Sequence, residues 1–179
     1  MTQMEQQCNE TWQPPPSSIY KLNFDAAIFA DMDRTGVGAI IRNEHGQVMV
    51  AMTATGLKVS SSEEAELLAR RRSMEFAVDA GFTMLIIEGD NVNVMQAISS
   101  SLINCSLLGY VVDDIHHLVH CLEWARISIT RRGGNKVAHA FAQHARNSLD
   151  NDVYWMEDSP PLAVEALIRM FCYYDFMNE

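Results

Sequence analysis

The stretch KLNFDAA, residues 21–27, places an acidic residue in the middle of a predicted β-strand. Leu22, Phe24 and Ala26 recur at every second position, which is the period of a strand with one apolar face. Strands disfavour Asp, because its short carboxylate competes for backbone hydrogen bonds and is costly to bury. Asp25 therefore needs a partner, and the rest of the chain supplies candidates for it.

The composition is that of an ordinary soluble globular protein. The chain has 179 residues, of which 48% are hydrophobic and 20% charged, enough for one domain with its own core. No apolar stretch approaches the roughly 20 residues that a membrane span needs. The start, MTQMEQQCNE, lacks the basic and apolar regions of a signal peptide. We therefore expect an intracellular protein, nuclear or cytoplasmic, with no secretion signal and no membrane partner.

Cysteine usage and charge narrow the function further. The four cysteines are scattered without any CxxC spacing, which favours free thiols in a reducing compartment over disulfides or a zinc knot. The net charge of −10 disfavours tight, nonspecific coating of nucleic acid. It leaves open a site where divalent cations bridge carboxylates and phosphates. No oligomeric state follows from the sequence.

The periodicity predicts an α/β domain over residues 19–158. A flexible Pro-rich leader would precede it at 1–18, and a C-terminal helix and acidic tail would follow at 159–179. Strands are predicted at 20–29, at two runs within 36–55 that turn at 43–46, and at 83–90 and 126–131. Helices are predicted at 60–81, 91–101, 110–124, 135–149 and 161–172. This order predicts a mixed sheet with helices on both faces.

Two features refine these elements. Ser60 or Ser61, with a glutamate three residues on, forms a capping box at the start of the first long helix. Gly36 and Gly38 indicate a bend or a close backbone approach, because no GxGxxG phosphate loop follows them.

Three acidic residues stand where elements begin, centre or end. Asp25 lies in the first strand, Glu66 in the opening turns of a helix, and Asp90 at the end of a strand. Carboxylates placed in this way can converge to bind Mg²⁺ or Mn²⁺. Taken singly, Glu66 is also explained by the helix dipole and Asp90 by a helix cap, whereas Asp25 has no such structural explanation.

Six motifs in order carry a resemblance across about residues 12–160. They are W-x-P-P, K-L-N-F-D-A-A, G-V-G-A-I-I-R-N-E-H-G, A-E-L-L-A, I-I-E-G-D-N and N-K-V-A-H-A-F-A. The sequence resembles the ribonuclease H-like domains common in plants, which are related to the RNase H segment of non-LTR retrotransposons. The resemblance implies an RNase H fold with a five-stranded mixed sheet. It also implies cleavage of the RNA strand of an RNA–DNA hybrid with two metal ions, Mg²⁺ or Mn²⁺.

The resemblance also assigns roles to particular residues. Asp25, Glu66 and Asp90 match the first three acids of the family's four-acid metal site, and His139 falls at the fourth. Plant members often carry His there, and imidazole suits Mn²⁺ better than Mg²⁺, which implies a slow nuclease or one that favours Mn²⁺. The alternative for His139 is a solvated helical histidine. The expected nucleic-acid contacts are Asn91, Arg132 and Asn135.

One further departure supports a second hypothesis. The family often has a His at the position that reads Ile129 here. Together with the net charge and His139, this residue favours an RNase H-fold nucleic-acid-binding or protein-interaction module with weakened catalysis. The three retained acids favour the enzyme, because crowded carboxylates repel one another and need a reason to persist.

Two other patterns are weaker signals. His116 and His120, at helical i, i+4 spacing, are compatible with zinc but better explained as a solvated stripe. The run Arg70–Arg72 is best explained by solvation and pairing with acids, although Arg70 could meet a phosphate.

Overall fold

A computed structural model describes residues 4–6, 11–99, 108–148 and 152–156. Its strands are β1 (Met4–Gln6), β2 (Tyr20–Phe29), β3 (Arg34–Arg42), β4 (Val48–Leu57), β5 (Met84–Gly89), β6 (Trp124–Ile129) and β7 (Val153–Met156). Its α-helices are α1 (Ser62–Asp79), α2 (Val92–Ser99), α3 (Gly109–His120) and α4 (Lys136–His144). In these ranges, no helix has both the length and the apolar character to span a membrane.

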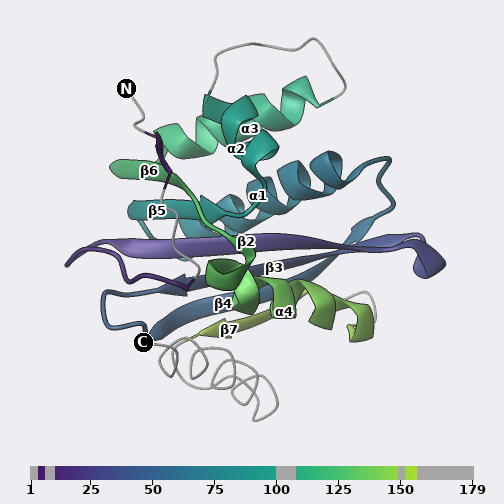
Figure 1. Ribbon diagram of the computed structural model, residues 1–179, viewed down its shortest axis with the longest axis horizontal. Coiled ribbons are helices and arrows are strands. Elements are labelled where there is room, and N and C mark those ends of the chain that lie inside the picture. The colour runs from purple at the N-terminus through teal and green to yellow at the C-terminus, as the bar shows by residue number, and fades with distance from the viewer. Residues whose placement is uncertain (1–3, 7–10, 100–107, 149–151, 157–179) are drawn as a thin grey trace.

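The strands form one mixed sheet in the order β1-β6-β5-β2-β3-β4-β7. Strands β2, β3, β4 and β7 pair antiparallel, whereas β1, β6, β5 and β2 pair in parallel. Helix α4 packs on one face, against β2, β3 and β4, and α1 packs on the other face with α3 behind it (Figure 1). The predicted mixed sheet with helices on both faces is confirmed. The count of five strands is wrong, because the described residues form seven.

The two extra strands lie at the edges of the sheet and are too short to show a period. β1 has three residues and pairs with β6, and β7 has four and pairs with β4. The weak packing expected of the leader at 1–18 does not hold for its described residues. Besides β1, Pro15 is buried, and Trp12 donates from its indole Nε1 to Asn23 Oδ1 at 2.9 Å.

Helix α1 starts as the sequence predicts but buries a different face. Ser61 caps it by accepting from the Glu64 backbone N–H at 3.1 Å, and Glu64 Oε2 in turn accepts from the backbone N–H of Ser60 at 2.7 Å. Arg70, expected in solvent or on a phosphate, is fully buried against Met95, and burial lowers its pKa to about 9. The reason is that Glu66, Arg70 and Ser73 share the stripe that faces the sheet.

Several element boundaries differ from the prediction. Helix α3 ends at His120 because Trp124 already pairs with Met84 in the ladder between β5 and β6, so the expected helix to 124 is too long. Helix α4 ends at His144 and continues as a 3-10 turn, Ala145–Asn147. The predicted helix at 161–172 lies outside the described residues. Cys121 is a free thiol, as predicted, and the other cysteines lie outside the described residues.

The two glycines of β3 mark a close approach of backbone, as predicted. A Cβ at Gly38 would lie 2.1 Å from the carbonyl oxygen of Ala138, and a Cβ at Gly36 would lie 2.2 Å from that of Ala142. Only glycine lets α4 lie this close to β3. Because Gly38 is the pairing partner of Asp25, this contact also brings α4 beside the acidic position of β2.

Candidate active site

Three carboxylates from separate elements meet beside the centre of the sheet. Asp25 comes from β2, Glu66 from the second turn of α1 and Asp90 from the bend after β5, and one ligand atom from each lies within 4.8 Å of the others. In the part of the chain that the structure describes, no other group of three His, Cys, Asp or Glu side chains is placed to share a metal ion. The structure thus brings together the three acids singled out in the sequence.

The cluster is electrostatically strained without a cation. Burial, followed by the charges of Asp25 and Asp90, raises the pKa of Glu66 to about 9, although the Ala26 backbone N–H partly offsets this rise. Burial and the charge of Asp25 also raise the pKa of Asp90, against the opposing effect of Arg132 and His139. Convergent carboxylate oxygens are the ligands that Mg²⁺ and Mn²⁺ prefer, so the donor set fits a divalent ion.

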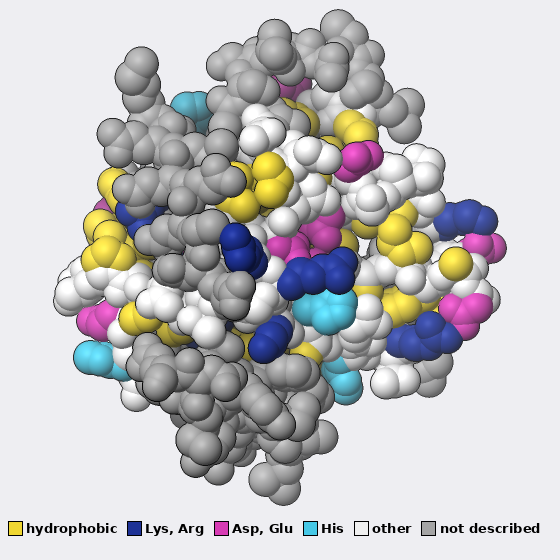
Figure 2. All heavy atoms as spheres, viewed as in Figure 1, with side chains coloured by type: hydrophobic (Ala, Val, Ile, Leu, Met, Phe, Trp, Pro, Cys, Tyr) yellow, Lys and Arg dark blue, Asp and Glu magenta, His cyan; other side chains and the backbone are white. Residues whose placement is uncertain are grey.

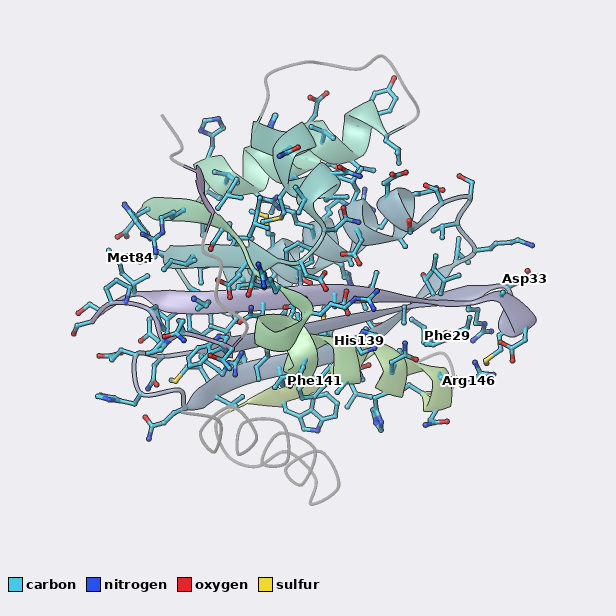
Figure 3. The ribbon with its side chains drawn as sticks, viewed as in Figure 1. Phe29, Asp33, Met84, His139, Phe141 and Arg146 are labelled. Carbon is cyan, nitrogen blue, oxygen red and sulfur yellow. The ribbon has the colours of Figure 1, made fainter. Side chains whose placement is uncertain are left out.

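His139 contacts this cluster from the opposite face of the sheet. It projects from α4 over β2, and its Nδ1 lies 2.6 Å from Asp25 Oδ2 (Figure 3). The imidazole is 58% exposed, whereas the Asp25 side chain is only 7% exposed. His139 is therefore solvated, but it is also bonded to the acid in the strand. If Nδ1 carries the proton, Nε2 is left with a lone pair for a cation, as in carboxylate–histidine–metal arrangements.

The three expected nucleic-acid contacts lie in different settings. Asn91 caps α2, since its Oδ1 accepts from the Val94 backbone N–H at 3.2 Å, and this leaves Asp90 free of the capping role. Arg132 is exposed on the 3-10 turn Arg132–Asn135, close enough to Asp90 to lower its pKa. Asn135 is 1% exposed, and its Nδ2 donates to the Phe24 carbonyl oxygen at 2.9 Å.

The charged surface around the cluster is mixed. Near the centre of the face in Figure 2, acidic side chains lie next to Lys or Arg and His side chains. Arg131, Arg132 and Lys136 are all exposed on the segment that leads into α4. A basic border beside a carboxylate cluster provides phosphate contacts even on a chain whose net charge is −10.

Comparison with known proteins places this arrangement in a family. The family model described as reverse transcriptase-like matches residues 23–145, more than half of the chain. The chain belongs to the reverse transcriptase-like family. The match contains Asp25, Glu66, Asp90 and His139. No curated protein gives a significant match.

Solved structures show that this family member has an RNase H fold. RNase H1 from the archaeon Halobacterium salinarum NRC-1 is 20% identical, with a TM-score of 0.66, covering 74% of this chain and 100% of its own. An N-terminal RNase H domain from Mycobacterium tuberculosis, solved as a fusion with maltose-binding protein, is 17% identical, with a TM-score of 0.63, covering 74% and 96%. LC11-RNase H1 in complex with an RNA/DNA hybrid is 16% identical, with a TM-score of 0.61, covering 72% and 97%.

Sequence reasoning missed a buried polar group behind the acids of this reverse transcriptase-like domain. Glu88, 2% exposed, accepts from Lys21, Asn23 and Ser128. The available signal was spacing, because Asn23 and Glu88 each stand two residues before a candidate ligand and so share its face of the sheet. Ile129, at the position where the family often has His, is buried in the core and offers no polar group.

The other weak signals have no part in this site. His116 is half-buried and His120 exposed on α3, outside the cluster of acids. Arg70 follows Glu66 by one helical turn but contacts Met95 Sδ at 3.4 Å, so a phosphate contact from it would require the helix packing to open.

Glu66→Gln is expected to flatten the pH dependence of stability in the metal-free protein. The unfolded chain releases the Glu66 proton near pH 4.5, whereas the folded protein holds it to about pH 9. The folded state thus binds the extra proton across this window, so the stability of the wild type falls as pH rises through it. Gln does not titrate, and at pH 8 we expect the variant to be more stable by about 2 kcal/mol.

The measurement is urea unfolding in EDTA at several pH values from 4.5 to 9. Glu63→Gln, on an exposed residue of the same helix, is the matched control and should keep the slope of the wild type. A wild-type protein whose stability does not change across this window would contradict the protonated state of Glu66.

Proposed function

We propose that the protein is a metal-dependent endonuclease that cleaves the RNA strand of RNA–DNA hybrids by two-metal-ion hydrolysis. The observation that carries this proposal is the convergence of Asp25, Glu66 and Asp90 within 4.8 Å on an RNase H fold. A solved RNase H1 of the same fold is in complex with an RNA/DNA hybrid, which supports this substrate class.

The side chains divide the binding of two ions among them. Asp25, between the other acids and His139, would serve both ions, and Glu66 and Asp90 would each serve one. His139 would complete the second site through Nε2 while its Nδ1 stays bonded to Asp25. When bound, Mg²⁺ or Mn²⁺ supplies activation of water and charge stabilisation at the phosphate. The protein's contribution is to hold the four ligands in place and to keep Glu66 ready to release its proton.

Hybrid recognition would depend on shape and on 2′-hydroxyl contacts in the minor groove, with little sequence preference. Arg132, exposed beside Asp90, is placed to contact a phosphate, and Asn91 lies at the start of α2 next to the same acid. Asn135 would contact nucleic acid only by giving up its bond to Phe24, so we propose that it acts by holding the 3-10 turn of Arg132 in place.

The test is cleavage of a labelled RNA strand in an RNA–DNA hybrid, in Mg²⁺ and separately in Mn²⁺. We expect cuts within the RNA strand, little or none in the DNA strand, and no cleavage in EDTA. Hybrid that stays intact in both metals, with a folded protein, would overturn the proposed activity.

A second candidate is a nucleic-acid-binding or protein-interaction module that has lost turnover. The specific observation in its favour is that His139, at the fourth acid position, already provides Asp25 with a protein partner at 2.6 Å. Thermal melting with Mn²⁺ or Mg²⁺ separates the two candidates, because an ion that binds only the folded state must raise the melting temperature. Melting that is unchanged at millimolar metal would favour the binding module.

His139→Asp is expected to raise Mg²⁺-dependent cleavage. An imidazole nitrogen suits Mn²⁺ better than Mg²⁺, which prefers oxygen ligands, so an aspartate should shift the preference toward Mg²⁺ by about tenfold. The measurement is the ratio of initial cleavage rates in the two metals for each protein. His144→Asp, at the end of the same helix, serves as the control for added charge. An unchanged ratio would remove residue 139 from the metal site.

We propose an intracellular site of action, nuclear or cytoplasmic, and an origin within the plant group of retrotransposon-related RNase H domains. Both rest on sequence observations: the absence of a signal peptide at the start of the given chain and the six ordered motifs.

A further inference from the structure

We propose that Trp12, Lys21, Asn23 and Glu88 form a positioning network that sets the spacing of the metal-binding carboxylates. This inference rests on the proposed function, because it concerns the same metal site. It gives the segment before the first long strand a role in catalysis. None of the four residues belongs to the acidic cluster itself.

The geometry of the network follows from strand register. β2 and β5 are parallel, and Asn23 is the pairing partner of Glu88. Since side chains alternate across a strand, the residues two positions on, Asp25 and Asp90, face the same side. Asn23 Nδ2 donates to Glu88 Oε2 at 2.9 Å, which links the two strands one repeat before the two acids. A change in this link therefore displaces one carboxylate relative to the other.

Glu88 is fully engaged inside the protein. Its Oε1 accepts from Lys21 Nζ at 3.1 Å and from Ser128 Oγ at 3.2 Å, and its Oε2 accepts from Asn23. Lys21, 3% exposed, also donates to the Gln13 carbonyl oxygen at 2.7 Å. Burial lowers the pKa of Lys21, and Glu88 opposes this shift. The carboxylate thus has protein partners on both oxygens and holds its neighbours instead of an ion.

The segment around Trp12 fixes the orientation of the Asn23 amide. Asn23 Oδ1 accepts from Trp12 Nε1 at 2.9 Å and from Arg42 Nη2 at 3.2 Å, and the Arg42 guanidinium stacks 3.9 Å from the centre of the Trp12 ring. With two donors on its oxygen, the amide can present only its N–H group to Glu88. A flipped amide would face an indole N–H and a guanidinium with its own N–H groups, leaving buried donors unpaired.

Two nearly isosteric substitutions test the network. Glu88→Gln keeps an oxygen for Lys21 and Ser128 but turns an NH₂ group toward the Asn23 amide, which replaces a hydrogen bond by two opposed donors. Trp12→Phe keeps an aromatic ring beside Arg42 but removes the N–H that holds Asn23. Thr53→Val is the matched control, because it removes a buried hydrogen bond from Thr53 Oγ1 to the Phe141 carbonyl oxygen, 2.6 Å long, outside the network.

The readout is the dissociation constant for Mn²⁺ alone, from electron paramagnetic resonance of the free ion, at a temperature where circular dichroism shows each protein folded. We expect Glu88→Gln to weaken Mn²⁺ binding by about tenfold, Trp12→Phe by a smaller factor in the same direction, and Thr53→Val not at all despite its lower melting temperature. Mn²⁺ affinity equal to that of the wild type in both network variants would overturn the inference. Wild-type protein that binds no Mn²⁺ would overturn the inference and the metal site together. Bound Mn²⁺ without hybrid cleavage would overturn only the proposed activity.

Discussion

Asp25→Asn is expected to abolish cleavage of the hybrid, by about 10³-fold or more. Asp25 is the one acid that contacts both sides of the site, since it lies within 4.8 Å of the Glu66 and Asp90 oxygens and bonds His139 at 2.6 Å. An amide has the same shape but no charge, so the loss reports the missing charge and not a missing volume. The variant should also lose the rise in melting temperature that metal gives the wild type.

The measurement is single-turnover cleavage of the labelled hybrid with wild type and variant purified identically, which excludes a contaminating nuclease. Asp31→Asn is the matched control, because this exposed aspartate carries the same charge near the end of the same strand and pairs only with Arg146 among its printed partners. It should cleave like the wild type. If Asp25→Asn cleaved as fast as Asp31→Asn, the acidic cluster would not be the active site.

Gly38→Ala is expected to destabilise the protein by about 3 kcal/mol or more. The new Cβ would lie 2.1 Å from the Ala138 carbonyl oxygen and 2.3 Å from the Ala142 nitrogen. Both are backbone atoms of α4, so no side-chain rotation relieves the clash and the whole helix must move off β3. The melting temperature should fall by roughly 10 °C, and His139 should move away from Asp25, with a loss of metal affinity.

Gly56→Ala is the control for the general cost of replacing a strand glycine. Its Cβ would meet the Thr35 hydroxyl oxygen at 2.5 Å, but that atom belongs to a side chain that can rotate away. We expect a loss of about 1 kcal/mol from the Thr35 hydrogen bond and no change in metal affinity. Thermal melting and Mn²⁺ titration of both variants provide the comparison. Equal losses would show that α4 is not held against β3 by the missing side chain.

The sequence predicted those parts of the fold that depend on local chemistry. Ser61 caps α1 because a hydroxyl there meets a free N–H, and Gly38 permits a close approach because it lacks a Cβ. The convergence of Asp25, Glu66 and Asp90 was predictable because acids at strand centres and ends have few other structural reasons. The assignment of these acids and His139 to a metal site stays a prediction.

The parts that could not be predicted depend on partners distant in sequence. β1 and β7 are too short for a period and exist only because β6 and β4 offer free edges. LEW at 122–124 continues the helical pattern of α3, yet Trp124 is claimed by its pairing with β5. Lys21 and Arg70 read as solvated cations, and only the packing of other elements shows that both are buried.

The parallel pairings of β1 with β6 and of β2 with β5 have a consequence for protein synthesis. During translation, Met4 has no partner until Ile127 has been made, and Asn23 waits for Glu88. His139 reaches Asp25 only after almost all of the sheet has left the ribosome. Long-range pairings of this kind form late, because loop closure must precede the contacts that reward it. A nascent or truncated chain that ends before α4 therefore carries three of the four proposed ligands but no complete nuclease site.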